Sequence, residues 1–96
     1  LSREYFELAL SYLIESDFSK GLVAGVPKHV PVAHKFGERF VDETNQKILH
    51  DCGIVYYPKN PYLLCVMVEG NEFPELEKVI STVSNVVYDE VYSRRI

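Results

Sequence analysis

The chain contains no tryptophan, a single methionine and only two cysteines among its 96 residues. Two cysteines without a C-x-x-C pair exclude a structural zinc site, which needs four ligands. No apolar run is long enough to span a membrane, and no signal-peptide pattern opens the chain. Basic residues are also scarce, since 10 Lys and Arg against 14 Asp and Glu give a net charge of −4. They form no basic stripe, so we expect no nucleic-acid partner.

The two cysteines, Cys52 and Cys65, lie in apolar segments that have the pattern of strands. If a tight hairpin joins these strands, the cysteines fall near each other on one face, roughly diagonal. A disulfide is compatible with that arrangement, but buried free cysteines commonly act as small hydrophobic residues. We therefore expect two buried thiols, and the redox compartment stays open.

The rest of the composition is that of an ordinary globular domain, with 47% apolar and 25% charged residues. We expect one domain over residues 1–96. A chain of this length buries only about 60–65% of its unfolded surface, so its stability margin is narrow. It opens at Leu1, without Met and directly before a helical pattern, which favours the C-terminal fragment of a larger protein.

Two helices are predicted ahead of the first strand. Residues 3–15 carry apolar side chains at helical spacing after Ser2, the expected N-cap. A break at 16–17 begins a short helix that runs through Leu22 and Val23. Gly25 then fits a left-handed C-terminal position.

Three strands follow, over residues 31–40, 48–57 and 62–69. The polar run 42–47 and the turn-rich segment 58–61 connect them. The third strand is apolar on both faces, so both of its faces must be covered. Period-two alternation in the first strand places on one side Val32, His34 and Phe36, and on the other Ala33, Lys35 and Gly37.

A final helix begins near Pro74, which fits a first helical turn. Its predicted apolar stripe consists of Leu76, Ile80, Val83, Val87 and Val91. The expected fold class is therefore α+β. It is a three-stranded antiparallel sheet in sequential β-β-β order, flanked by an N-terminal helix, a short helix and a long C-terminal helix.

Lys35 is the first candidate for chemistry. A fixed cation in a cleft attracts a substrate carboxylate and stabilises a nearby ionised hydroxyl. An edge-strand lysine that discourages unwanted pairing is the simpler interpretation, and chemistry alone favours it. Gly37, two residues later, permits the close approach of a ligand or of another backbone, although a bulge would also explain it.

The order of four features carries a family resemblance. They are the helix end at Gly25 to Pro27, the strand with Lys35-Phe36-Gly37, the pair His50-Asp51 that opens the next strand, and an aliphatic third strand followed by a long helix. Together they resemble the C-terminal portion of class A β-lactamases and related penicillin-recognising serine hydrolases. The resemblance covers nearly the whole chain and implies a partial β-lactamase/transpeptidase-like fold.

The resemblance also implies roles for a few residues. Lys35 would border the cleft and support a serine nucleophile of a separate helical lobe. Phe36 and Gly37 would contact the substrate, and the backbone N–H of Glu38 would supply half of the oxyanion hole. The implied substrate is a β-lactam or a peptidoglycan-like small molecule, with no metal and no cofactor, in a bacterial protein that is secreted or belongs to the cell envelope.

Two departures from that pattern limit the activity. Phe36 has no hydroxyl, so one contact to a substrate carboxylate is missing, at a cost of about 1.5–3 kcal/mol. No Ser-x-x-Lys in a suitable setting and no Ser-Asp-Asn occur in the chain. Without a positioned nucleophile and base, acyl transfer is chemically excluded for the chain alone, so whether it counts as an enzyme stays open.

Other catalytic constellations are weaker. His34 and His50 lack zinc-ligand spacing, and strand alternation puts His50 and Asp51 on opposite faces, so we expect ordinary hydrogen-bonded histidines. A Ser–His–Asp triad fails similarly, because Ser81 and Ser84 fall within a helix and have no nucleophile elbow.

Two hypotheses remain open for the whole chain. The first is the fragment of a serine hydrolase, whose third strand would leave an exposed edge and favour a homo-oligomer through that edge. The second is a non-catalytic small α+β binding module, or a degenerate family member that binds without hydrolysis. A small sheet flanked by helices occurs in both kinds of protein, so architecture does not decide between them.

Overall fold

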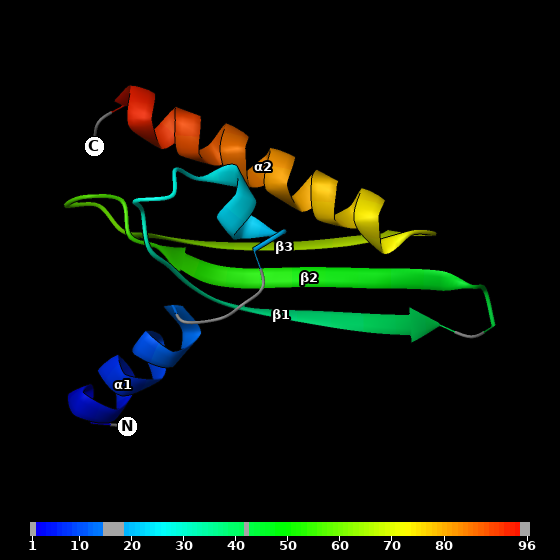
Figure 1. The fold of residues 1–96 in the computed structure, drawn as a ribbon, viewed down its shortest axis with the longest axis horizontal. Helices are drawn as coiled ribbons and strands as arrows, with labels where there is room; N and C mark the ends of the chain where they lie inside the picture. Colours follow the sequence, from blue (N-terminus) through cyan, green and yellow to red (C-terminus); the bar gives the residue numbers. More distant parts are fainter. Residues whose placement is uncertain (1, 15–18, 42, 95–96) are drawn as a thin grey trace.

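The computed structural model describes residues 2–14, 19–41 and 43–94. The elements follow in the predicted order (Figure 1). They are α1 (Arg3–Ile14), the 3-10 helix η1 (Leu22–Gly25), β1 (Val32–Val41), β2 (Gln46–Val55), β3 (Tyr62–Gly70) and α2 (Phe73–Arg94). The α+β class is confirmed. Among the described residues no helix is both long and apolar enough to cross a membrane.

The three strands form one antiparallel sheet in the order β1-β2-β3. Turn residues make the tight connections, with Asn45 and Lys59 in the left-handed region at φ 56° and 70°. The first strand alternates as predicted. β2 begins two residues earlier than expected, because Gln46 and Lys47 continue the ladder opposite Val41 and Phe40.

One face of the sheet packs against α2, which lies over β2 and β3, and against η1, which contacts β1, β2 and α2 (Figure 1). Its core consists of Leu22, Val30, Val32, Leu49, Val55, Leu76, Ile80 and Tyr88. The predicted stripe of α2 is right at Leu76 and Ile80 but wrong at Val83, which is 37% exposed. Ser84 and Tyr88 are buried instead, because the helix turns that side toward η1.

Gly25 does not adopt the left-handed conformation expected of it, since no described glycine has a positive φ. Its lack of a side chain serves close packing. A Cβ there would lie 2.5 Å from the carbonyl oxygen of Ser81 and 2.6 Å from Cβ of Ser84. Glycine therefore lets η1 rest directly on the backbone of α2.

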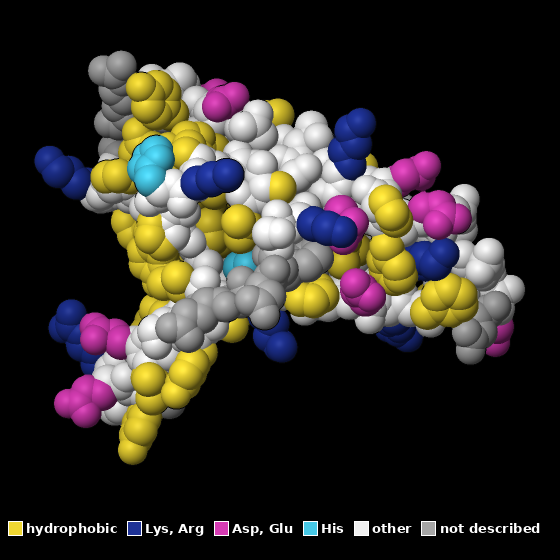
Figure 2. Space-filling view, viewed as in Figure 1, with side chains coloured by type: hydrophobic (Ala, Val, Ile, Leu, Met, Phe, Trp, Pro, Cys, Tyr) yellow, Lys and Arg dark blue, Asp and Glu magenta, His cyan; other side chains and the backbone are white. Residues whose placement is uncertain are grey.

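The α1 helix forms as predicted, and Ser2 caps it through a hydrogen bond from the Tyr5 amide to the Ser2 hydroxyl. None of its residues is buried. It contacts β1 alone among the elements, and Figure 2 shows hydrophobic side chains gathered along it and in the recess beside it. The predicted break at residues 16–17 lies outside the described residues.

Candidate functional site

Lys35 lies on the face of the sheet that α2 and η1 leave open. In the ladder it is directly opposite Cys52, and Cys52 is directly opposite Cys65, so the three side chains form one row across the strands. Lys35 is exposed, whereas its neighbours Ala33 and His34 are buried. The structure thus places the predicted cation at the surface, at the β1 side of the open face.

The ladder also fixes the direction of the Glu38 amide. Directly opposed residues alternate between hydrogen-bonded pairs and closer pairs without hydrogen bonds. The Cα atoms of Cys52 and Cys65 are 4.0 Å apart, which identifies a pair without hydrogen bonds. The backbone of Cys52 therefore bonds to β1, at Lys35, and Gly37 bonds to β2 in the same way. The amide of Glu38, one residue on, points away from β2 at the outer side of β1.

Gly37 lies beneath the side chain of His50, its direct partner on β2. A Cβ at Gly37 would overlap the imidazole ring of His50, so the glycine makes room for that ring. His50 is itself exposed, two residues from Cys52 on the open face. Sequence analysis placed His50 on the face opposite Asp51, which the structure confirms, but did not place it over Gly37.

Phe36 lies on the other face of β1 from Lys35. Its ladder partner Asp51 is fully buried on the helix side, and Phe36 itself is 36% exposed. Lys35, Gly37 and the Glu38 amide are therefore grouped at one edge, whereas the Phe36 ring projects from the opposite side of the strand. The roles of these four residues in binding and catalysis stay predictions.

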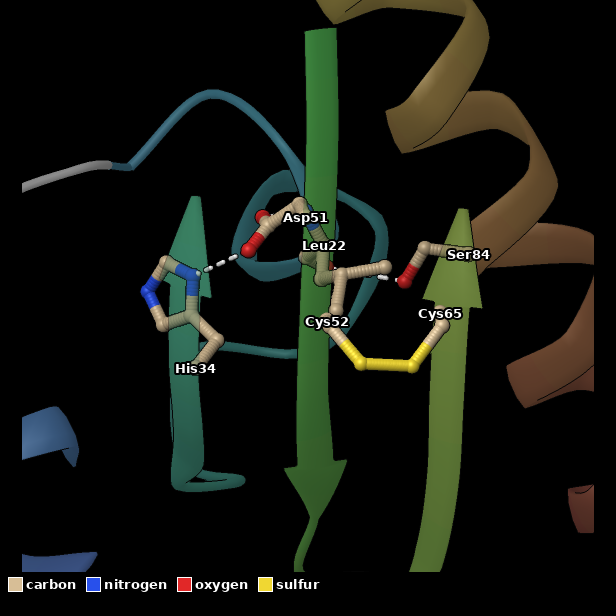
Figure 3. Close-up of polar contacts among 6 residues, drawn as sticks. All are labelled: Leu22, His34, Asp51, Cys52, Cys65 and Ser84. Carbon is tan, nitrogen blue, oxygen red and sulfur yellow. Dashed lines mark hydrogen bonds and ion pairs between the residues drawn. A yellow bond between two sulfur atoms is a disulfide. The ribbon is translucent and has the colours of Figure 1, made fainter. Parts of the chain in front are cut away.

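The cysteines differ from expectation. Cys52 and Cys65 form a disulfide between β2 and β3, they are directly opposite rather than diagonal, and both are exposed (Figure 3). The prediction of two buried thiols is wrong. They pair because the register between β2 and β3 places Cys52 directly opposite Cys65, whereas a β2–β3 connection two residues shorter or longer would have placed them diagonally. They are exposed because both lie on the face of the sheet that α2 and η1 leave open.

Behind the open face lies a buried chain of hydrogen bonds that links four elements (Figure 3). Nδ1 of His34 lies 2.8 Å from Oδ1 of Asp51, and the Leu22 amide donates to Oδ2 at 2.9 Å. The Ser84 hydroxyl donates to the Leu22 carbonyl at 2.8 Å. The side chains of His34 and Asp51 are 1% and 0% exposed. This network holds β1, next to Lys35, against β2, η1 and α2.

The prediction that His34 is an ordinary hydrogen-bonded histidine is confirmed, but its partner was missed. The sequence separates His50 from Asp51 by parity, but only the register between β1 and β2 shows that Asp51 is on the face of His34. Ser84, His34 and Asp51 do not form a catalytic triad. The Ser84 hydroxyl bonds to a backbone carbonyl rather than to the imidazole, and all three side chains are buried.

Two tyrosines at the α2 side have perturbed ionisation. Burial, with the nearby Tyr88 phenol as a second cause, raises the pKa of Tyr62 above its usual 10.0. Burial, together with Tyr57, Tyr92 and Asp89, raises the pKa of Tyr88. Both lie away from Lys35 on the helix side of the sheet. Among the described residues, no three His, Cys, Asp or Glu side chains are grouped closely enough to hold a metal ion.

Comparison with known families identifies the family of the protein that contains β1 and Lys35. The model of the Beta-lactamase2 family, the beta-lactamase enzyme family, matches residues 1–91, which is nearly the entire chain. The chain belongs to the beta-lactamase enzyme family. The predicted resemblance to penicillin-recognising hydrolases is thereby confirmed at the level of the family.

Solved structures share the fold of this chain. The chain is similar to PBP-A, at 24% sequence identity and a TM-score of 0.78, over 97% of its own length. It is equally similar to a mutant of PBP-A in an acyl-enzyme complex with penicillin G. The chain spans only 34% of the length of either structure, so both structures extend well beyond the matched part. No curated protein sequence matches the chain.

Proposed function

We propose that the chain supplies the Lys-x-Gly wall of the substrate cleft in a bacterial, extracytoplasmic serine hydrolase, and that it is inactive by itself. The substrate is a β-lactam or a related acyl-peptide. Lys35 attracts the substrate carboxylate and supports the serine of a separate lobe, and the Glu38 amide donates to the oxyanion. Gly37 keeps the strand open to the substrate backbone.

One observation carries this proposal: Lys35 and the outward-pointing Glu38 amide both belong to β1, the strand at one edge of the sheet, three residues apart. A cation and a backbone donor that are fixed in one strand need no rearrangement when negative charge develops on a bound carbonyl. The buried His34–Asp51 contact of 2.8 Å fixes the strand immediately beside Lys35. The mutant of PBP-A forms an acyl-enzyme complex with penicillin G, which supports the same chemistry here.

The exposed apolar side chains on the open face support the proposal that another part of a larger protein packs against it. Leu63 and Met67 on β3 are each 71% exposed, which is unusual for two apolar side chains on one strand. A strand that is apolar on both faces is expected to be covered on both. The rest of a family fold, of which this chain spans 34% of the length, would provide such a cover.

Phe36 favours a second candidate function, a family member that binds but turns over poorly. The phenyl ring cannot donate the hydroxyl hydrogen bond to a substrate carboxylate that the family pattern implies. Losing a hydrogen bond to a charged group lowers affinity by about one to two powers of ten. The oxyanion contact is a backbone group and is unaffected.

The isolated chain provides the first test. Exposed to nitrocefin and to a labelled penicillin, it should show no hydrolysis above background and no acyl adduct by intact-mass analysis. Turnover by the chain alone would contradict the proposal, because it would require a nucleophile that the family pattern places elsewhere.

A chimera provides the second test. The chain replaces the matching third of PBP-A, and folding is checked by circular dichroism. We expect a penicillin adduct that forms at least about tenfold more slowly after Lys35→Ala, and about ten- to a hundredfold faster after Phe36→Thr. Lys28→Ala, an exposed lysine ahead of β1, is the matched control and should change nothing. A folded chimera that reacts equally fast with and without Lys35 would reject the proposal.

A further inference from the structure

His50 lies on the open face of the sheet, and its imidazole ring lies over Gly37 of the neighbouring strand β1. A Cβ at Gly37 would overlap Nε2 and Cε1 of the ring but would stay 3.2 Å from Cδ2. The Nε2 end of the ring is therefore the end that reaches furthest over β1. Within the described part of the chain, His50 makes no side-chain hydrogen bond or ion pair, so both ring nitrogens are available to a further partner.

The ring lies close to both groups that the proposed function uses. Because a Cβ is one bond from its Cα and the next nitrogen is two bonds from that Cα, Nε2 of His50 lies at most about 6 Å from the Glu38 nitrogen. Lys35 precedes Gly37 by two residues, so its side chain is on the same face, about 7 Å along the strand. His50 thus lies beside the proposed cation and the proposed oxyanion donor at once.

The inference drawn from this geometry rests on the proposed function. There the serine of a separate lobe is supported by Lys35, and the carbonyl that it attacks accepts a hydrogen bond from the Glu38 amide. The serine must then approach over the open face between these two groups, which is the space above Gly37. The His50 ring already borders that space. A lobe that packs over the open face therefore brings the serine and the imidazole together.

We propose that His50 is a positioning residue of the cleft: its imidazole hydrogen-bonds to the segment that carries the serine and holds the serine hydroxyl between Lys35 and the Glu38 amide. A neutral imidazole has one donor and one acceptor nitrogen, so it can accept from a hydroxyl or donate to a backbone carbonyl. No proton is transferred in this role. Gly37 thereby has a second purpose, since a side chain there would displace the ring.

The chimera with PBP-A tests this role by the rate of penicillin adduct formation. At saturating penicillin G we expect His50→Ala to slow the reaction about two- to tenfold, the effect of losing one ordinary hydrogen bond. The penicillin concentration that gives half the maximal rate should change little, because His50 acts on the serine rather than on the substrate. His50→Gln should recover most of the rate, since an amide can replace the hydrogen bond. His29→Ala, at an exposed histidine ahead of β1, is the matched control and should change nothing.

Nitrogen NMR of the imidazole rings gives a second measurement, which needs no turnover. The hydrogen bond that one ring nitrogen makes decides which nitrogen carries the proton. In the isolated chain the His50 ring should exchange between its two tautomers, whereas in the folded chimera it should adopt one. His29 should exchange in both proteins.

The outcomes separate this inference from the proposed function. If Lys35→Ala slows the chimera and His50→Ala does not, the role of His50 is wrong and the proposed function stands. If Lys35→Ala has no effect, the proposed function fails and this inference fails with it. Equal slowing by His50→Ala and His50→Gln, with a lower melting temperature in both, would assign His50 a purely structural role and overturn the proposal. A His50 ring that exchanges between tautomers in the folded chimera would overturn it as well.

Discussion

Asp51 is fully buried, and each of its carboxylate oxygens accepts a hydrogen bond, one from His34 and one from the Leu22 amide. An ionised carboxylate only accepts, so Nδ1 of His34 is the donor. Apolar burial elsewhere is modest in a chain of this size. We infer that a large share of the mutual positioning of β1, β2 and η1 depends on this one side chain.

Replacing Asp51 tests that inference. Asp51→Leu keeps the branching and the number of side-chain heavy atoms but leaves two buried donors unsatisfied, so we expect a loss of about 3–5 kcal/mol in the free energy of unfolding. Asp51→Asn should cost less, because its amide can serve both neighbours if His34 changes tautomer. Asp89→Leu on exposed α2 is the control and should stay within about 0.5 kcal/mol. Urea unfolding measures all three, and equal midpoints for Asp51→Leu and the control would contradict the prediction.

The buried tyrosines predict how stability depends on pH. Because the pKa values of Tyr62 and Tyr88 are raised in the folded chain, ionisation favours the unfolded chain once pH passes 10.0. The contribution of the two neutral tyrosines to the free energy of unfolding should be fully present below pH 10.0 and should fall as the pH rises toward their pKa values in the folded chain. Urea midpoints between about pH 8 and 11 measure the fall.

A double variant separates this effect from the titration of lysines in the same range. Tyr62→Phe with Tyr88→Phe should flatten the alkaline part of the curve, whereas Tyr5→Phe, at a position 67% exposed, should leave it as it is. The Tyr62 hydroxyl is also buried without a hydrogen-bond partner among the described residues, so its removal carries little cost at neutral pH. An unchanged alkaline slope in the double variant would refute this explanation.

At the scale of elements, the sequence predicted what depends on local periodicity. The alternation around Lys35 gave its face correctly because the period of a strand is two whatever it pairs with. The pairing of His34 with Asp51 and the direct opposition of Cys52 and Cys65 depend on register between strands, which no local pattern contains. The burial of α2 at Ser84 depends on η1 packing beside it, which again is set by long-range contacts.

Two glycines at close contacts, Gly25 against α2 and Gly37 against His50, predict different losses of stability when each is replaced by alanine. Gly25→Ala would press a methyl group against the backbone of α2, at Ser81 and Asn85, which cannot move aside cheaply. We expect a loss of about 1–3 kcal/mol, the usual cost of overpacking. Gly37→Ala meets only the exposed ring of His50, which can rotate away, so it should cost clearly less. Thermal unfolding of the two variants compares them, and a larger loss for Gly37→Ala would show that the His50 ring is fixed.

At the scale of the whole molecule, the two faces of the sheet are covered unequally, since α2 and η1 pack over one face and α1 contacts β1 alone. α2 and η1 protect one face of the sheet, while β3 is an edge strand within the described part of the chain and carries the exposed side chains of Leu63 and Met67. An edge strand of this kind pairs readily with another chain. Self-association of the isolated chain through β3 stays a prediction.

Proline substitutions along β3 can test it, because successive amides of a strand point in opposite directions. Cys65 and Met67 direct their amides away from β2, since the Cys52–Cys65 pair is one without hydrogen bonds, and Val66 directs its amide toward β2. Met67→Pro should therefore remove an outward donor, keep the fold and shift a concentration-dependent dimer toward monomer in analytical ultracentrifugation. Val66→Pro should instead break the β2–β3 ladder and lower the melting temperature sharply. A wild-type chain that stays monomeric at high concentration would exclude edge pairing, and a dimer unaffected by Met67→Pro would place the interface on another surface.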